Sequence, residues 1–207
     1  MSVINKLASS LNRRDEVPNQ ELAKQLADKS DKKAIKELID NLNNKSRDLQ
    51  HDCIKVLYEI GEIKPKLISG YVKEFIALLD NKNNRLQWGA MTAINTIALE
   101  NPELIYNTLT KIISTAERGS VITRDYAVNI LIKLCSIKQY SKNAFSLLNE
   151  QILRSPVNQL PMYAEKAMTI INDNNKNLFI KTLTIRLDDI EKESKRKRIE
   201  KVIKKFS

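Results

Sequence analysis

Apolar residues recur along most of the chain three, four and seven positions apart, which is the spacing of one face of an α-helix. In the segment that starts at Leu49, the small residue Cys53 is followed at these distances by apolar residues. The same arrangement returns every 37 residues, with small residues at Cys53, Ala90, Ala127 and Ala164. The pattern predicts four copies of one helix, in which the small residue lets a neighbouring helix approach closely.

Another helix repeats with the same period and precedes this one in each copy. Its apolar positions are Ile35, Leu38, Ile39 and Leu42, then Val72, Phe75, Ile76 and Leu79, then Leu109, Ile112 and Ile113. Pro65 and Pro102 are expected to open the first helix of the next pair, where a missing N–H costs little. A lone pair cannot bury both apolar stripes, so stacked pairs supply the core. The sequence therefore predicts an all-α solenoid.

Both ends of the chain depart from this period. One N-terminal helix is predicted from Val3 to Leu11, and a second is predicted to be capped by Asn19 and to run to Ala27. Because no Pro-, Gly- or Ser-rich linker interrupts the sequence, we expect a single domain. The predicted boundaries are 1–30 for N-terminal capping helices, 31–174 for four repeats, 175–207 for a C-terminal capping pair and 1–207 for the domain.

The stretch Arg124-x-x-Ala127-x-x-x-Leu131, in the second helix of a pair of this length, resembles the HEAT repeat of the armadillo-like superfamily. The resemblance covers roughly residues 31 to 207 and implies a right-handed α-α superhelix of about five helix pairs, whose second helices line a concave surface. Equivalent positions in the other copies depart from the pattern, with Gln50, Gln87 and Pro161 in place of the arginine. From Asn83 to Thr96 the sequence also resembles small bacterial HEAT-like proteins without an assigned activity.

Composition agrees with a helical protein. Glycine and proline number 4 and 5, and aromatic residues make up 5%, so the residues that β-sheets use for turns and faces are scarce. No apolar run is long enough to span a membrane, and the first residues lack the pattern of a secretory signal. We therefore expect a cytoplasmic protein in which Cys53 and Cys135 are reduced core residues.

The formal charge of +10 permits binding to nucleic acid, to an anionic membrane or to an acidic protein. Half of it lies between Glu191 and Ser207, where eight basic side chains stand against three acidic ones. Helical spacing places part of them on one side, either as a solvated surface or as a docking patch for anionic partners. The predicted basic patch consists of Lys197, Lys201, Lys204 and Lys205.

Catalytic motifs are not evident in the sequence. His51 is the single histidine, it lies opposite the predicted core face, and no second ligand stands at metal spacing. The glycine-rich loops that hold phosphates or dinucleotides are missing, as is the G-x-S-x-G elbow of hydrolases. The sequence predicts a protein that is not an enzyme and that has neither a cofactor nor a metal.

Trp88 occupies the helical position of His51 and Asp125 in the neighbouring copies, on the predicted concave face. It either presents its indole to a partner or packs against a neighbouring turn or the adjacent second helix. The predicted partner-binding face consists of Trp88, Arg85, Thr92, His51, Lys55, Arg124, Asp125 and Asn129. This mixture is polar with modest positive charge.

These features favour a non-catalytic scaffold whose concave surface holds a protein or peptide. The alternative is a nucleic-acid-binding protein related to the HEAT-type DNA glycosylases of alkylation repair, which the charge and Trp88 favour. Membrane binding ranks last, because the apolar side of the C-terminal helix is expected to pack in the last repeat.

Overall fold

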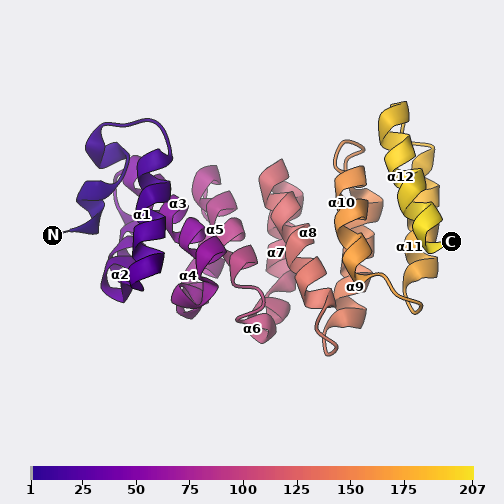
Figure 1. Ribbon diagram of the computed structural model, residues 1–207, viewed down its shortest axis with the longest axis horizontal. Coiled ribbons are helices and arrows are strands. Elements are labelled where there is room, and N and C mark those ends of the chain that lie inside the picture. Colours follow the sequence, from indigo (N-terminus) through magenta and orange to yellow (C-terminus); the bar gives the residue numbers. More distant parts are fainter. Residues whose placement is uncertain (1) are drawn as a thin grey trace. The chain divides into compact units, whose positions relative to one another are not determined.

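The structure, a computed structural model, describes residues 2–207, and these residues form helices, turns and loops without a β-strand (Figure 1). The helices follow one another in hairpins, as the repeated apolar pattern predicts. The α-helices are α1 (Val17–Lys29), α2 (Lys32–Asp40), α3 (Arg47–Ile63), α4 (Val72–Leu78), α5 (Asn84–Thr96), α6 (Pro102–Asn107), α7 (Leu109–Arg118), α8 (Val121–Cys135), α9 (Ser141–Arg154), α10 (Leu160–Ala167), α11 (Lys176–Leu187) and α12 (Glu193–Phe206). The 3-10 segments are η1 (Val3–Lys6), η2 (Ser9–Leu11), η3 (Asn41–Asn43), η4 (Pro65–Leu67), η5 (Ser69–Tyr71) and η6 (Met168–Ile170).

The chain forms two compact units, an N-terminal unit (Met1–Ala127) and a C-terminal unit (Val128–Ser207). The boundary falls inside α8, so one helix belongs to both. A single domain over 1–207 remains a prediction. Within residues 2–207, no helix combines the length and the apolar character that a membrane crossing requires.

In the N-terminal unit, α2 pairs with α3 and α4 pairs with α5, while α3 lies between α1 and α5. The second helices of successive pairs therefore pack side by side, and α1 takes the place of a second helix ahead of the first pair. In the C-terminal unit the first helices α9 and α11 are neighbours, as are the second helices α10 and α12. Each unit is thus built in two layers of helices.

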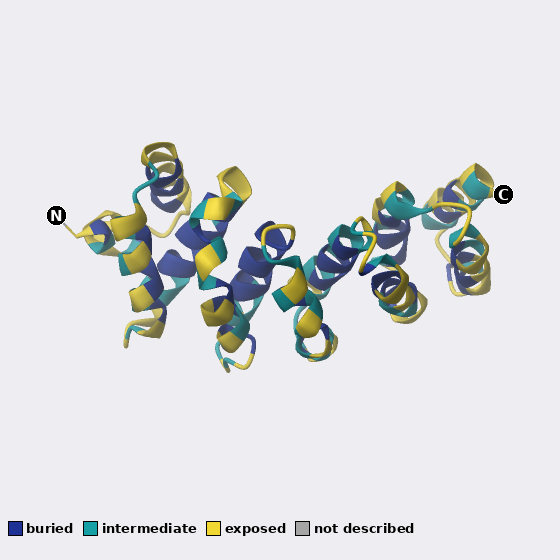
Figure 2. Cartoon of the chain, turned by 90° about the horizontal axis from the view of Figure 1, so that it is seen from below, coloured by how far each residue is buried: buried dark blue, intermediate teal, exposed yellow. Residues whose placement is uncertain are grey.

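The small residues of the repeat lie where the period predicts them. Cys53, Ala90, Ala127 and Ala164 are all on second helices and are all buried. In α5 the backbone approaches α3 closely next to this position, since a Cβ atom at Gly89 would lie 2.8 Å from Cγ1 of Ile54. Figure 2 shows the buried residues on the inner sides of the helices. The repeat predicted from the sequence is confirmed.

The predicted helix from Val3 to Leu11 is wrong. Two 3-10 turns occupy this segment, because Leu7 between them is extended and fully buried. Asn12 then ends the second turn with a left-handed backbone, φ 55°. The extended break at Leu7 leaves the following backbone N–H groups free to bind side chains of other helices.

The prediction that Asn19 caps the second helix is also wrong. Helix α1 begins at Val17, and Pro18 fits into its first turn because N–H groups there have no intrahelical acceptor. Asn19 is buried instead, where its Oδ1 accepts a hydrogen bond from the Ala8 N–H (3.0 Å) and its Nδ2 donates to Asp52 (2.7 Å). The asparagine therefore ties the N-terminal segment to α3.

Of the two repeated prolines, one opens a first α-helix and one does not. Pro102 begins α6, as predicted, whereas Pro65 begins the 3-10 turn η4 and the α-helix of that pair starts only at Val72. Gly70, a weak helix former, lies in the intervening segment. The first helix of this pair is therefore shorter than the period suggests.

Both thiols are predicted to be unreactive in the folded protein. Burial raises the pKa of Cys53 and that of Cys135 to about 12, and only the thiolate reacts quickly with a disulfide reagent. With Ellman's reagent at about pH 8 we expect slow labelling of the native chain and fast labelling of both thiols in urea. Fast native labelling in a Cys135→Ser variant, which leaves Cys53 alone, would contradict this assignment.

Candidate partner-binding face

Trp88 on α5 packs against Tyr58 on α3. The two ring centroids are 6.0 Å apart and the ring planes are inclined by 48°. The Lys55 ammonium lies 5.0 Å from the centroid of the Tyr58 ring. Trp88 is half-buried. Of the two predicted arrangements, the structure has the one in which Trp88 packs against the adjacent second helix, and part of its surface still reaches solvent.

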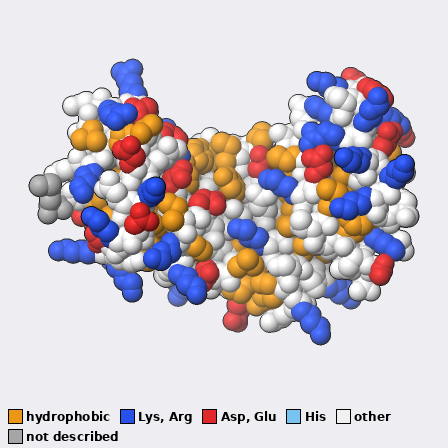
Figure 3. Space-filling view, in the orientation of Figure 1, with side chains coloured by type: hydrophobic (Ala, Val, Ile, Leu, Met, Phe, Trp, Pro, Cys, Tyr) orange, Lys and Arg blue, Asp and Glu red, His pale blue; other side chains and the backbone are white. Residues whose placement is uncertain are grey.

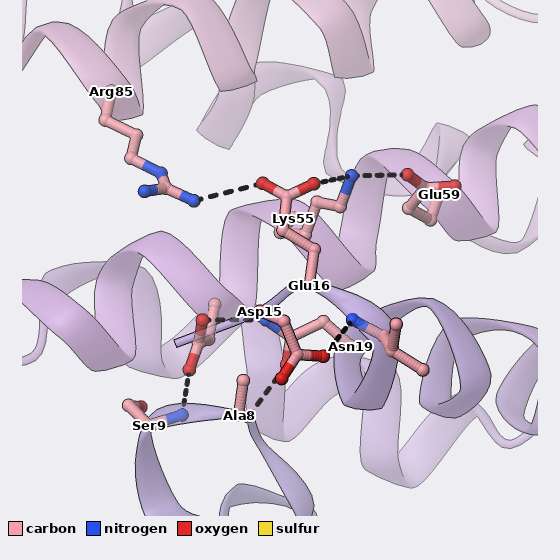
Figure 4. A network of polar contacts seen from close by, with 10 residues as sticks. Ala8, Ser9, Asp15, Glu16, Asn19, Lys55, Glu59 and Arg85 are labelled. Carbon is pink, nitrogen blue, oxygen red and sulfur yellow. Dashed lines mark hydrogen bonds and ion pairs between the residues drawn. The ribbon is translucent and has the colours of Figure 1, made fainter. Parts of the chain in front are cut away.

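Glu16, just before α1, binds two basic side chains of the predicted face (Figure 4). Its carboxylate lies 2.8 Å from the Lys55 ammonium and 3.3 Å from the Arg85 guanidinium, and Lys55 also pairs with Glu59 at 2.7 Å. Burial alone would lower the pKa of Lys55, but the hydrogen bonds with the two carboxylates outweigh it and raise this pKa. Lys55 is therefore charged and already paired.

The expectation that Lys55 faces a partner is thus wrong, since its side chain is buried under Glu16 and Glu59. The same prediction is wrong for Thr92, which is buried and whose hydroxyl donates to the carbonyl oxygen of Trp88 (2.9 Å). Arg85 remains partly exposed, with 42% of its side chain accessible. Of these residues, only Trp88 and Arg85 keep surface that a ligand could touch.

Tyr126, at the start of α8, joins this face although the sequence did not single it out. Burial raises the pKa of Tyr126, a hydrogen bond with Thr92 lowers it, and the carboxylates Glu62 and Glu59 raise it. The ring thus lies near Thr92, one turn beyond Trp88. Tyr126 lies at the repeat position of Gly89, directly after the position of Trp88. An alignment of the copies therefore places its ring beside the predicted face. We call Tyr58, Trp88 and Tyr126 the aromatic row.

The remaining predicted residues are partly buried or bound to groups of the chain itself, and one of them belongs to the other unit. His51 is half-buried and its Nε2 lies 2.9 Å from the Asn83 amide nitrogen at the start of α5, so it is not simply a solvated histidine. Arg124 donates to the Glu117 carbonyl oxygen (3.2 Å), and Asp125 beside it is half-buried. The structure assigns Asn129 to the C-terminal unit, where it accepts a hydrogen bond from Lys166 (3.0 Å).

Charge on this face differs from the modest positive charge that the sequence suggested. Both Lys55 and Arg85 are matched by carboxylates. Glu62, near Tyr126, is exposed and forms no ion pair within the part of the chain that the structure describes. The aromatic row is therefore bordered by a carboxylate that remains available to a ligand.

A polar cleft of about 530 Å³ lies beside this face in the N-terminal unit. Charges of both signs line it, and the ion pair between Arg13 and Asp15 (2.8 Å) satisfies two of its side chains. Asp52 on its wall accepts from the Ser9 N–H (2.8 Å) and from Asn19, so its carboxylate serves the fold. Over residues 2–207, no three His, Cys, Asp or Glu side chains lie together as a metal site requires.

The predicted basic patch lies on α12 in the C-terminal unit. Lys197, Lys201, Lys204 and Lys205 are exposed, while Ile199 and Val202 on the other side of the helix are buried. Figure 3 shows Lys and Arg side chains crowded over the end of the chain that holds α12. This surface and the aromatic row belong to different units.

Comparison with solved structures finds designed helical-repeat proteins. A designed armadillo repeat protein in complex with the peptide (KR)4 has a TM-score of 0.64 and 16% identity, covering 100% of this chain and 100% of that chain. An engineered protein has a TM-score of 0.60 and 19% identity, and a second designed armadillo repeat protein has 0.61 and 15%, each covering 99% of this chain and 100% of the other. No protein-family model and no curated protein sequence matches. The chain has a helical-repeat fold of the armadillo-like kind.

Proposed function

We propose that this chain is a non-catalytic binding scaffold that holds an extended segment of a partner protein on the aromatic row of its N-terminal unit. The observation that carries the proposal is the half-exposed Trp88, held against Tyr58 on two adjacent second helices. Large aromatic side chains are favoured anchors at protein interfaces because they bury much surface with few rotatable bonds. Tyr58 already orients the Trp88 side chain in the free protein. Binding a partner therefore costs little conformational entropy at Trp88.

The surroundings of the aromatic row favour a partner segment that contains Lys or Arg. A cationic side chain placed over an aromatic ring is attracted by the ring, and the exposed carboxylate of Glu62 adds attraction nearby. A designed armadillo repeat protein similar in fold is in complex with the basic peptide (KR)4, which supports peptide binding by this architecture. The paired Lys55 and Arg85 present no uncompensated positive charge to repel such a segment.

Trp88→Ala is expected to weaken binding of the cellular partner, isolated by affinity capture and then titrated by calorimetry, at least tenfold, as truncation of an aromatic anchor does. Because Trp88 packs on Tyr58, the variant is also expected to lose about 1–2 kcal/mol of stability. Trp88→Phe keeps an aromatic ring and is expected to retain most of the affinity.

Tyr106→Ala serves as the matched control, because it removes another half-buried aromatic side chain of the same unit, from the first helix α6. It is expected to lower stability and leave affinity unchanged. Equal affinity of the wild type and Trp88→Ala would remove the aromatic row from the proposal. A partner that shows no preference for Lys or Arg would remove the role of Glu62.

A further inference from the structure

Positive charge is concentrated in the C-terminal unit. Residues 128–207 contain 16 Lys and Arg against 8 Asp and Glu, a net charge of +8, which leaves +2 of the total +10 for residues 1–127. A charge of this size on one small unit raises the local concentration of anionic molecules. The two units therefore differ in the partners that electrostatics favours.

Three carboxylates on or beside α12 are already paired with other basic residues. Glu193 pairs with Lys197 (3.4 Å), Glu200 with Arg196 (3.3 Å), and Glu165 on α10 with Arg198 (2.6 Å). The hydrogen bond from Arg198 holds the pKa of Glu165 below its ordinary value. Each of these carboxylates therefore has another basic side chain as its ion-pair partner, although the charge of Lys201 also acts on Glu165.

Of the remaining lysines of α12, Lys195 is half-buried and donates to Asn158, which leaves Lys201, Lys204 and Lys205. They are exposed, and no carboxylate of the described chain lies within ion-pair distance of them. Their spacing of three and four residues places them on one side of α12, within roughly 6 Å along the helix axis. We call these three residues the lysine stripe.

The helix that carries the lysine stripe is firmly held. Ile199 and Val202 are buried on its other side, and the Phe206 ring contacts Phe179 of α11 edge-on, with centroids 6.2 Å apart. The apolar side of α12 is thus used in the unit, and it is not available for insertion into a membrane. The stripe is a rigid array of like charges facing solvent.

A protein interface needs an apolar or aromatic centre in addition to charge, and the apolar residues beside the lysine stripe, Val202 and Phe206, are already used in packing within the unit. A phosphate backbone needs only positive charge, because release of its counterions supplies the free energy. We infer that the lysine stripe binds the phosphate backbone of duplex nucleic acid without reading its sequence. Phe206, the aromatic side chain beside Lys205, packs edge-on against Phe179 of α11, so it is not placed to hold a displaced base.

The test is a fluorescence-anisotropy titration of the full chain with a labelled, mixed-sequence DNA duplex. Three phosphate contacts predict an association constant that falls about 40-fold between roughly 50 and 200 mM salt. The triple variant Lys201→Gln, Lys204→Gln, Lys205→Gln is expected to lose most of the affinity at low salt and most of the salt dependence. Duplexes of unrelated sequence are expected to bind equally.

The matched control is Lys24→Gln, Lys29→Gln, Lys33→Gln, which removes the same charge from exposed lysines of the N-terminal unit. It is expected to bind DNA nearly as the wild type does. Failure of the wild type to bind at low salt, or an equal loss in both triple variants, would overturn the inference. Binding of polyglutamate in place of DNA would overturn it as well and would assign the stripe to acidic proteins. None of these outcomes depends on Trp88, so the proposed peptide site is tested independently.

Discussion

Replacing Arg186 with methionine is expected to lower the free energy of unfolding by about 3–5 kcal/mol, the usual cost of breaking a buried charged network. The side chain of Arg186 is buried, and its guanidinium donates to the carbonyl oxygens of Ile152 (3.1 Å), Leu153 and Ser155 (2.9 Å). These carbonyls lie at or just beyond the end of α9, where the last carbonyl oxygens of a helix have no intrahelical N–H partner. Methionine fills similar space but removes these donors, so that only the Ile152 carbonyl keeps a partner, the hydroxyl of Ser155.

Urea unfolding followed by far-UV circular dichroism measures this effect. Arg154→Met is the matched control, because Arg154 forms an exposed ion pair with Glu150 and lies at the end of the same helix. Its loss is expected to cost less than about 1 kcal/mol. Arg186→Lys keeps the charge but loses the planar fork of donors, so an intermediate cost is expected. Similar unfolding curves for Arg186→Met and Arg154→Met would contradict the structural role.

Replacing Gly61 with alanine is expected to destabilise the protein by about 3 kcal/mol, although alanine is the better helix former. A Cβ atom at Gly61 in α3 would lie 2.1 Å from Oγ1 of Thr96 and 2.8 Å from Cδ1 of Ile68. Thr96 and Ile68 are buried, so neither can move away freely. The same urea experiment measures the change.

Thr96→Ala in the Gly61→Ala background removes the Oγ1 atom and is expected to recover part of the lost stability. Gly70→Ala is the control, because a Cβ atom there meets nothing within 4 Å. It is expected to change the free energy of unfolding by less than about 1 kcal/mol and to stabilise if anything. A Gly61→Ala variant as stable as Gly70→Ala would show that α3 and α5 can separate at this point.

The repeat could be predicted because it rests on a local rule, the spacing of apolar residues on one helix face. That rule places Ala90 and Ala127 inside second helices, where the structure has them. It fails at Leu7, where the apolar spacing is helical but the backbone is extended. The N–H groups that follow bind Asn19 and Asp52, and a pattern within one segment does not contain these distant partners.

The candidate site was predicted in part for a related reason. The repeat position of Trp88 is correct, and its contact with Tyr58 joins positions 30 residues apart on neighbouring second helices. The burial of Lys55 depends on Glu16, which lies outside the period in a segment that folds back over α3. Helical geometry gives the direction of a side chain, but it does not tell which other segment covers it.

Helix α1 also bears on how copies of this protein behave toward one another. Its inner side buries Leu22, Ala23 and Leu26 against the unit, while Glu21, Lys24 and Gln25 point outward. In helical-repeat proteins an uncovered apolar edge accepts a further hairpin, whether from the same chain or from another molecule. With α1 in place the outward side of that edge is mostly polar, apart from the exposed Val17, which disfavours end-to-end association of copies into fibres.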